Sequence, residues 1–144
     1  MCGIAGLLGF NLLQSKLKIK SLLSSMASSL QHRGPDSNGI FTSDEDQIGL
    51  VHTRLSIQDL SNSGSQPMHS WDKRFVLSFN GEIYNHKNLR SIIKDYPFKG
   101  TSDTETLVAL ISTIGLKNTL EKVSGMFAFA LWDSFEKKLY LALR

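Results

Sequence analysis

Strand-like apolar segments stand near both ends of this chain of 144 residues, and helix-like segments cluster between them. Residues 3–10 are almost wholly apolar, and residues 126–132 and 138–143 form an apolar pair around a turn at Asp133-Ser134. Short apolar runs bounded by turn residues are typical of buried strands. Strands at both ends with helices between them predict an α+β domain, in which antiparallel sheet is layered with helices.

The middle of the chain adds further strands and several helices. Apolar residues recur at helical spacing over 16–30, and the loop 31–36 then ends that helix with a Gly-Pro pair. Ser102 with Glu105 three residues later forms a capping box, which predicts a helix starting at Asp103. The expected elements are strands at 39–42, 47–53 and 74–80, a turn at Asn80-Gly81, and helices at 16–30, 85–95, 103–114 and 116–123.

Composition argues against several classes of partner. The net charge of +3 is weak and its lysines are scattered, which does not favour nucleic-acid binding. Apolar runs are far shorter than the ~20 residues that cross a membrane, and the start lacks the basic region of a signal peptide. A single cysteine excludes an internal disulfide and fits a reducing compartment. We therefore expect a cytoplasmic protein that binds neither nucleic acid nor membrane.

That single cysteine, Cys2, directly follows Met1. Removal of Met1 would leave one residue with both a thiol nucleophile and a free α-amine. Free amines and thiols titrate within about two pH units of neutrality, and an N-terminal amine can act as the base for its own nucleophile. The alternative is that a lone cysteine near a terminus has no chemical role.

A thiol that attacks a carboxamide also needs donors for the oxyanion and groups that hold the substrate. Asn80 and Gly81 can supply a side-chain and a backbone N–H donor, or they can form a plain hairpin turn. Arg54 can clamp a carboxylate bidentately, or it can be an ordinary surface residue. Asp103, with Glu82 nearby, can pair with an ammonium group; alternatively, Asp103 is simply favourable at a helix N-terminus.

Metal and phosphate sites are not indicated. The four histidines lack the spacing of a metal site, and the chain has no glycine-rich phosphate-binding motif. We expect neither a metal nor a cofactor in this chain. The histidines are His32, His52, His69 and His86.

Seven short motifs, in order along nearly the whole chain, resemble the class II glutamine amidotransferases. Within that family they are similar to the glutamine-hydrolysing asparagine synthetase branch. The motifs are Met1-Cys2-Gly3-Ile4-Ala5-Gly6, His32-Arg33-Gly34-Pro35-Asp36, Arg54-Leu55-Ser56-Ile57, Gln66-Pro67-Met68, Asn80-Gly81-Glu82-Ile83-Tyr84-Asn85, Ser102-Asp103-Thr104-Glu105 and Gly125-Met126-Phe127-Ala128-Phe129-Ala130.

The resemblance implies an N-terminal-nucleophile hydrolase fold, a four-layer αββα sandwich. It also implies hydrolysis of L-glutamine to glutamate and ammonia through a γ-glutamyl thioester on Cys2. The loop 32–36 would be structural and lie near the site. Carried over residue by residue, Cys2 would be nucleophile and base, Asn80 and Gly81 the oxyanion hole, Arg54 the ligand of the α-carboxylate, Asp103 and Glu82 the ligands of the α-ammonium, and Leu55, Ser56, Ile57 and Gln58 the backbone lining of the pocket.

By the same resemblance, residues 1–144 are the glutaminase domain, ending before the last strands of the family domain. The synthetase domain that uses ATP and magnesium is absent from the chain, and in the parent protein it would be the partner that receives the ammonia. A homodimer stays open. Two alternatives also stay open: the same chemistry serving another acceptor (a sugar, a nucleotide precursor or another carboxylate), and a catalytically silent domain of the same fold.

Overall fold

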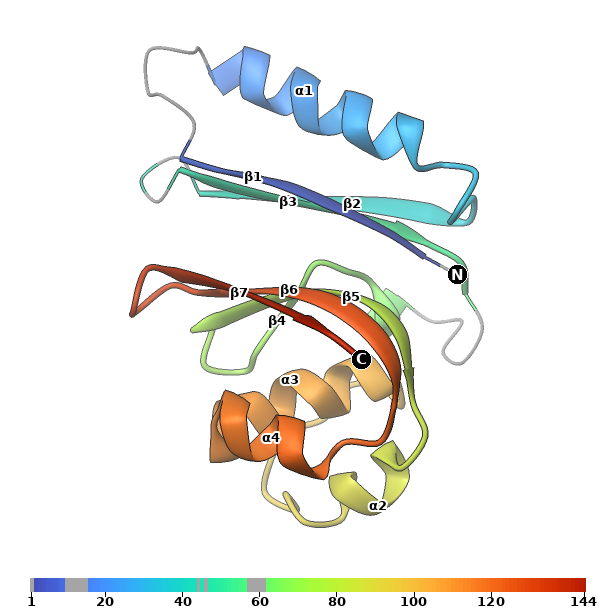
Figure 1. Cartoon of the computed structure of the whole chain (residues 1–144), viewed down its shortest axis with the longest axis vertical. Coiled ribbons are helices and arrows are strands. Elements are labelled where there is room, and N and C mark those ends of the chain that lie inside the picture. Colours follow the sequence, from blue (N-terminus) through green and yellow to red (C-terminus); the bar gives the residue numbers. More distant parts are fainter. Residues whose placement is uncertain (1, 10–15, 44, 46, 57–61) are drawn as a thin grey trace.

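The protein folds into four layers: a helix, a sheet, a second sheet and a group of helices (Figure 1). The structure, a computed structural model, describes residues 2–9, 16–43, 45, 47–56 and 62–144. This layering confirms the predicted α+β class and the αββα arrangement. In chain order the elements are β1 (Gly3–Leu8), α1 (Lys16–Ser29), β2 (Ser37–Ser43), β3 (Ile48–Arg54), the 3-10 turn η1 (Asn62–Gly64), β4 (Met68–His69), β5 (Phe75–Ile83), α2 (His86–Arg90), α3 (Asp103–Ile114), α4 (Leu116–Lys122), β6 (Gly125–Asp133) and β7 (Lys138–Leu143).

The first sheet has the order β1-β3-β2, and both pairings are antiparallel. Alternate residues of a strand point to opposite faces. One face of β3 therefore meets α1, where Val51 packs with Leu23 in a small buried cluster. The other face of β3 meets the second sheet through Ile48 and Leu50.

The second sheet has the order β4-β5-β6-β7 and is also antiparallel. Helix α3 covers its outer face (Figure 1). Among the described residues, sixteen buried apolar side chains form the core between this sheet and its helices. Leu107 and Leu110 of α3 are buried there against Leu77 and Phe129 of the sheet.

Two polar contacts join the sheets in addition to their shared apolar layer. The imidazole of His52 on β3 donates from Nε2 to the carbonyl oxygen of Phe79 on β5, over 3.1 Å. The hydroxyl of Ser78 donates to the carbonyl oxygen of Val51, also over 3.1 Å. Since all four residues are buried, these bonds fix how the two sheets lie against each other.

The turn expected at Asn80-Gly81 is wrong. Strand β5 runs through both residues to Ile83, and Gly81 pairs with Phe127 of β6. An Asn-Gly pair favours a turn locally, but here the pairing of two nine-residue strands outweighs that preference.

The helix expected over 85–95 is much shorter in the structure. Helix α2 ends at Arg90, and the hydroxyl of Ser91 donates to the carbonyl oxygen of Asn88. A serine that bonds to the nearby backbone in this way competes with continuation of a helix. The remaining predicted elements are present with ends shifted by at most three residues, and residue 10 of the first strand lies outside the described residues.

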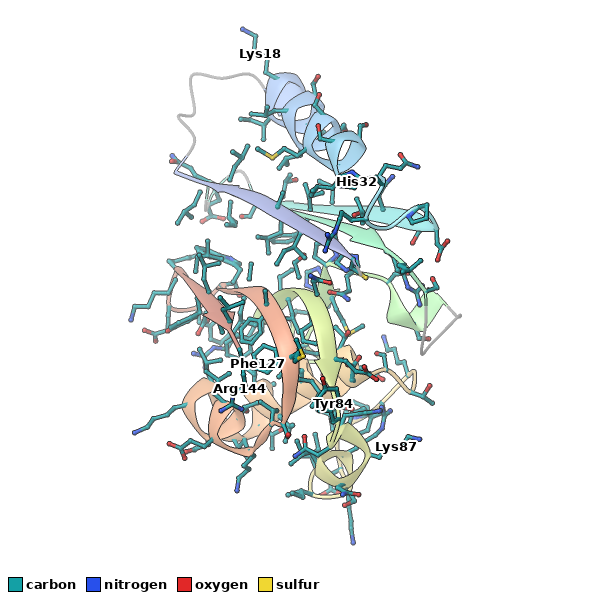
Figure 2. All side chains as sticks on the ribbon, turned by 45° about the vertical axis from the view of Figure 1, so that its right-hand side comes forward. Lys18, His32, Tyr84, Lys87, Phe127 and Arg144 are labelled. Atoms are coloured by element: carbon teal, nitrogen blue, oxygen red, sulfur yellow. The ribbon has the colours of Figure 1, made fainter. Side chains whose placement is uncertain are left out.

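The last described residues belong to the second sheet. Arg144 and Phe127 exchange two backbone hydrogen bonds, and the Arg144 guanidinium donates to the carbonyl oxygen of Val123 after α4 (Figure 2). No helix in the described part of the chain is both long and apolar enough to span a membrane.

Candidate active site

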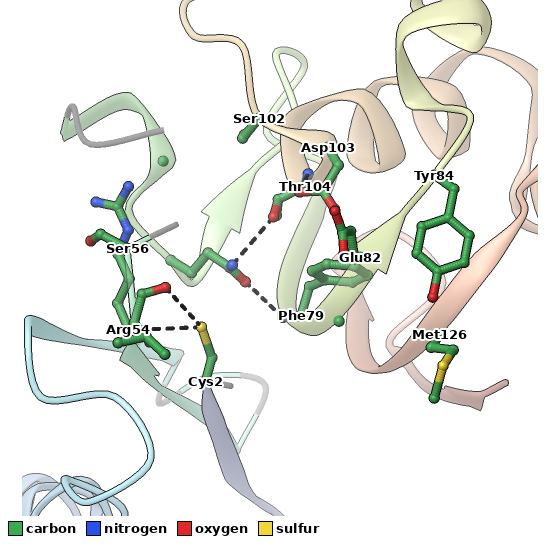
Figure 3. Close-up of a pocket in the computed structure, with 14 residues that line it drawn as sticks. Cys2, Arg54, Ser56, Phe79, Glu82, Tyr84, Ser102, Asp103, Thr104 and Met126 are labelled. Atoms are coloured by element: carbon green, nitrogen blue, oxygen red, sulfur yellow. Dashed lines mark hydrogen bonds between the residues drawn. The ribbon is translucent and has the colours of Figure 1, made fainter. Parts of the chain in front are cut away.

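A cavity of about 290 Å³ lies where β1 and β3 of the first sheet meet β5 and the start of α3 (Figure 3). Both sheets contribute to its walls. Of the residues predicted from the sequence, it brings together Cys2, Arg54, Leu55, Ser56, Gly81, Glu82 and Asp103. The other predicted positions are Asn80, treated below, and Ile57 and Gln58, which lie outside the described residues.

Cys2 reaches the cavity from the leading end of β1. Gly3 pairs with Thr53 of β3, so the antiparallel register sets Cys2 beside Arg54. The Cys2 sulfur accepts a hydrogen bond from the backbone N–H of Leu55, over 3.4 Å, and lies 3.8 Å from the Leu55 carbonyl oxygen. The thiol is half-buried. It is therefore held at the cavity wall while remaining accessible.

The loop 31–36 supports the strand end that carries Arg54. The backbone N–H of Asp36 donates to the Arg54 carbonyl oxygen over 3.0 Å. The Asp36 carboxylate in turn accepts from the backbone N–H of Ser56 over 2.7 Å. Asp36 of this loop thus holds the backbone on either side of Leu55. His32, at the other end of the loop, lies beside α1 and away from Tyr84 at the cavity (Figure 2).

Asp103 is the first residue of α3 and is buried at the cavity wall. Its carboxylate accepts from the backbone N–H of Ile83 over 2.9 Å and from that of Thr104 over 2.8 Å. Burial raises the pKa of Asp103, and these two N–H groups and the neighbouring His86 lower it in part. A cation bound beside the carboxylate would favour its ionised form.

At the start of α3, only one of the two hydrogen bonds of the predicted capping box is present. The Ser102 hydroxyl accepts from the backbone N–H of Glu105 over 3.2 Å. The Glu105 carboxylate instead accepts from the N–H groups of Lys99 and Gly100, and it pairs with Arg90. These contacts fix the loop that precedes α3 and so the position of Asp103.

Gly81 lines the cavity from β5, and its position suits only glycine. Its φ is 156°, and an added Cβ would collide with the carbonyl oxygen of Met126 and with Phe127. Its neighbour Asn80 is half-buried and is not among the described residues that line the cavity. Strand alternation places Asn80 on the same face of β5 as Ser78, toward the first sheet.

Charge is distributed unevenly around the cavity. In Figure 3, Arg54 stands on the wall formed by the first sheet, and Glu82 and Asp103 stand on the opposite wall, with Cys2 between them in this view. One cationic and two acidic side chains on facing walls complement a ligand that carries both an ammonium and a carboxylate, such as an α-amino acid.

Sequence reasoning gave no site role to six side chains that line the cavity: Gln66, Phe79, Tyr84, Ser102, Thr104 and Met126. Gln66 and Thr104 are buried, whereas Tyr84 and Met126 are exposed. All of the six except Phe79 fall inside motifs that the family resemblance singled out. The motifs marked the right segments, but their spacing gave no reason to assign these side chains to a cavity.

His52 lies next to the cavity but is committed to structure. It is 1% exposed, and burial lowers its pKa to about 4 despite the hydrogen bond to the Phe79 carbonyl oxygen, with a further lowering from Arg54. Its imidazole is therefore neutral at pH 7. No group of three or more His, Cys, Asp or Glu side chains within the described ranges is placed to hold a metal ion.

The αββα layers, with a thiol beside residue 1 at the cavity between the sheets, define an N-terminal-nucleophile hydrolase fold. The structure is similar to that of glutamine phosphoribosylpyrophosphate amidotransferase from B. subtilis, with a TM-score of 0.71. That likeness covers 97% of this chain and 36% of the other, at 20% sequence identity.

The chain belongs to the glutamine amidotransferase domain family, whose match covers residues 1–143. It is 42% identical to asparagine synthetase B [glutamine-hydrolyzing] of Escherichia coli and 36% identical to asparagine synthetase [glutamine-hydrolyzing] 2 of Bacillus subtilis, over 98% of this chain in both cases. It is also 40% identical to amidase chry2 of Gibberella zeae, over 78% of this chain. The chain spans 24%, 18% and 17% of these three relatives. The predicted family resemblance is confirmed.

Proposed function

We propose that this chain hydrolyses L-glutamine to glutamate and ammonia through a γ-glutamyl thioester on Cys2. The observation that carries the proposal is the cavity itself, which sets the one thiol of the chain between Arg54 and Asp103. Arg54 would hold the α-carboxylate of glutamine, and Asp103 with Glu82 would hold its α-ammonium. The γ-carboxamide is then left to face Cys2.

The chemistry needs a base, which the α-amine of Cys2 supplies once Met1 is removed. The amine takes the thiol proton as the sulfur attacks the carbonyl carbon of the γ-carboxamide. The tetrahedral oxyanion is stabilised by N–H donors of Asn80 and Gly81. The amine then gives its proton to the departing nitrogen, which leaves as ammonia, and the thioester forms. Water, deprotonated by the same amine, adds to the thioester and releases glutamate and the thiol.

The remaining backbone of the pocket would come from Leu55 and Ser56, continued by Ile57 and Gln58. Support for the first two is their place on the cavity wall. A backbone lining discriminates glutamine by its carboxamide hydrogen bonds, since unpaired polar groups in a buried site are costly.

The test compares the wild-type chain with Cys2→Ala. Glutamate release should fall at least about 10⁴-fold, since the nucleophile of a covalent mechanism is lost. Intact mass after acid quenching should show loss of Met1 and, in wild type only, an added glutamyl group. Because Cys2 is the one cysteine of the chain, a modified thiol needs no further assignment. Equal glutamate from both proteins would contradict the thiol mechanism.

We further propose that the ammonia serves ATP-dependent synthesis of asparagine in a cytoplasmic parent protein, in which a synthetase domain binds ATP and magnesium. Support comes from the similarity to glutamine-hydrolysing asparagine synthetases, of which this chain spans only about a quarter or less. The similarity to an amidase favours a second candidate, the same glutaminase serving another acceptor. Fusing the chain to each class of acceptor domain and assaying amide formation from glutamine separates the two.

A further inference from the structure

Among the described residues, no strand pairs with the full length of the β5 edge that runs along the cavity. Strand β4 pairs with the beginning of β5 over two residues only. Continuing its register would set Gln66 opposite Phe79 and Gly64 opposite Gly81. Pro67 intervenes, and proline has no N–H to give to a ladder. The chain thus leaves the sheet just where β5 reaches the cavity.

Three backbone N–H groups of β5 lie along this edge, because alternate residues direct their N–H to the same side of a strand. The first, of Phe79, donates to Oε1 of the Gln66 side chain over 2.6 Å. The third, of Ile83, donates to the Asp103 carboxylate over 2.9 Å. The middle one belongs to Gly81, which lines the cavity. Two side chains therefore bracket the one N–H that faces a ligand.

Phe79, the residue before the Asn80-Gly81 pair, is held on both of its backbone polar groups. Gln66 accepts from the Phe79 N–H, and His52 donates to the Phe79 carbonyl oxygen. Gln66 is itself buried, and its Nε2 lies 3.4 Å from the Thr104 hydroxyl on α3. In Figure 3, the dashed lines that reach Phe79 and Thr104 mark these two hydrogen bonds.

We propose that Gln66 is a positioning residue for the oxyanion donors. Its side-chain carboxamide replaces the ladder hydrogen bond that β4 does not make, and so fixes the Phe79–Gly81 backbone at the distance from Cys2 that the tetrahedral oxyanion requires. This inference rests on the proposed glutaminase function. It adds Gln66 to the residues that take part, without assigning it a contact with glutamine.

The effect should fall on the chemical step. Losing one oxyanion donor outright costs about 10²–10³ in rate in other hydrolases, so displacing one should lower kcat by about 10–100-fold. The affinity for glutamine should change by less than about threefold, since Arg54 and Asp103 are untouched and uniform binding is separate from transition-state binding.

The experiment uses Gln66→Met, which keeps the side-chain length and removes both polar groups. Three quantities are compared with wild type: kcat, the dissociation constant for glutamine in a Cys2→Ala background, and the inhibition constant of the aldehyde analogue of glutamine. That aldehyde forms a tetrahedral thiol adduct, so its affinity reports the oxyanion donors. Its binding should weaken by the same factor as kcat, while glutamine binding stays within threefold. Thr104→Val, which removes only the longer hydrogen bond, should lose less than Gln66→Met.

The outcomes separate cleanly. If the wild-type chain releases glutamate and Gln66→Met has an undiminished kcat, the positioning role alone is overturned. A fall in glutamine affinity that accounts for the whole loss of kcat/KM also overturns the positioning role, since Gln66 would then act on binding. A wild-type chain that releases no glutamate contradicts the proposed function and this inference with it.

A second variant carries the test if Gln66→Met does not fold. Gln66→Glu keeps an oxygen acceptor for the Phe79 N–H and can accept from the Thr104 hydroxyl. It should keep kcat within about tenfold of wild type, because the bond that positions β5 is retained. A loss as large as that of Cys2→Ala would overturn the role assigned to the Gln66 oxygen.

Discussion

The two sheets of this molecule pack against apolar cores of different size. The first sheet carries Cys2 and Arg54 and packs on α1 through a small cluster, in which the described residues include only four buried apolar side chains. The second carries Gly81 and meets α3, which carries Asp103, over a core of sixteen. The thiol and Arg54 thus stand on the thinly packed half, whereas Gly81, Glu82 and Asp103 stand on the dense half. Alignment of the site depends on the contacts that join the two sheets.

The largest expected effect tests the packing contrast itself. Leu110 and Leu23 are both fully buried, one in each half. Leu110→Ala should lower the free energy of unfolding by about 4 kcal/mol, because its dense surroundings cannot collapse into the cavity. Leu23→Ala should cost only about 2–3 kcal/mol, because a helix lying on one sheet face can relax. Urea unfolding measures both, and equal losses would remove the contrast.

The next effect concerns the imidazole between the sheets. Burial lowers the pKa of His52 to about 4, from 6.5 in the unfolded chain. Below pH 6.5 the unfolded chain takes up a proton that the folded protein excludes, so stability falls as the pH falls, and this loss levels off near pH 4. The full loss corresponds to about 3 kcal/mol.

The measurement compares urea unfolding of wild type and His52→Gln at pH 7 and pH 4.5. Glutamine keeps an N–H donor for the Phe79 carbonyl oxygen but does not titrate. The variant should lose about 2–3 kcal/mol less than wild type on acidification. Parallel losses in the two proteins would mean that His52 is protonated as readily when folded as when unfolded.

A third prediction addresses the donor side of the site. Gly81→Ala forces a Cβ against the Met126 carbonyl oxygen and Phe127, so β5 must shift. Glutamate release should fall by at least about 100-fold, as for loss of an oxyanion donor. Gly115→Ala is the matched control: its φ is 84° and the space around it is open. That control should cost about 1 kcal/mol in stability and keep its activity.

The smallest effect tests a single bond between the sheets. Ser78→Ala removes the buried hydrogen bond to the Val51 carbonyl oxygen and should cost about 1 kcal/mol. Ser112→Ala removes an exposed bond to Asp72 and should change stability by less than about 0.5 kcal/mol. Thermal unfolding of both variants checks the difference. A Ser78→Ala protein as stable as the Ser112 control would show that the Ser78–Val51 hydrogen bond does not help to join the sheets.

The sequence predicted most of the fold because local signals and tertiary structure agree in most elements. Helix α3 begins where Ser102 caps it, and β6 and β7 form the expected hairpin. The length of α2 was overestimated because Ser91 bonds to the nearby backbone. The error at the turn arose where a local preference lost to pairing across the sheet. Asn80-Gly81 is turn-like by itself, but Gly81 is paired in β5 because β6 lies alongside it.

The candidate site was predictable as a set of residues and not as an arrangement. The motifs singled out Cys2, Arg54 and Asp103, yet only strand register sets Cys2 beside Arg54. The role of Gln66 depends on where β4 ends. A strand of only two residues is too short to show an alternating pattern in the sequence. Side chains that act on another residue's backbone leave no spacing pattern to detect.

The brevity of β4 has a consequence for inhibition. The edge of β5 that holds the Gly81 N–H lacks a described partner strand beside the cavity, and proteins can bind extended peptides at a strand edge through main-chain hydrogen bonds. A short peptide continuing the register of β4 would take that N–H for its own carbonyl oxygen. It would compete with the oxyanion of glutamine for the Gly81 N–H and so block the reaction.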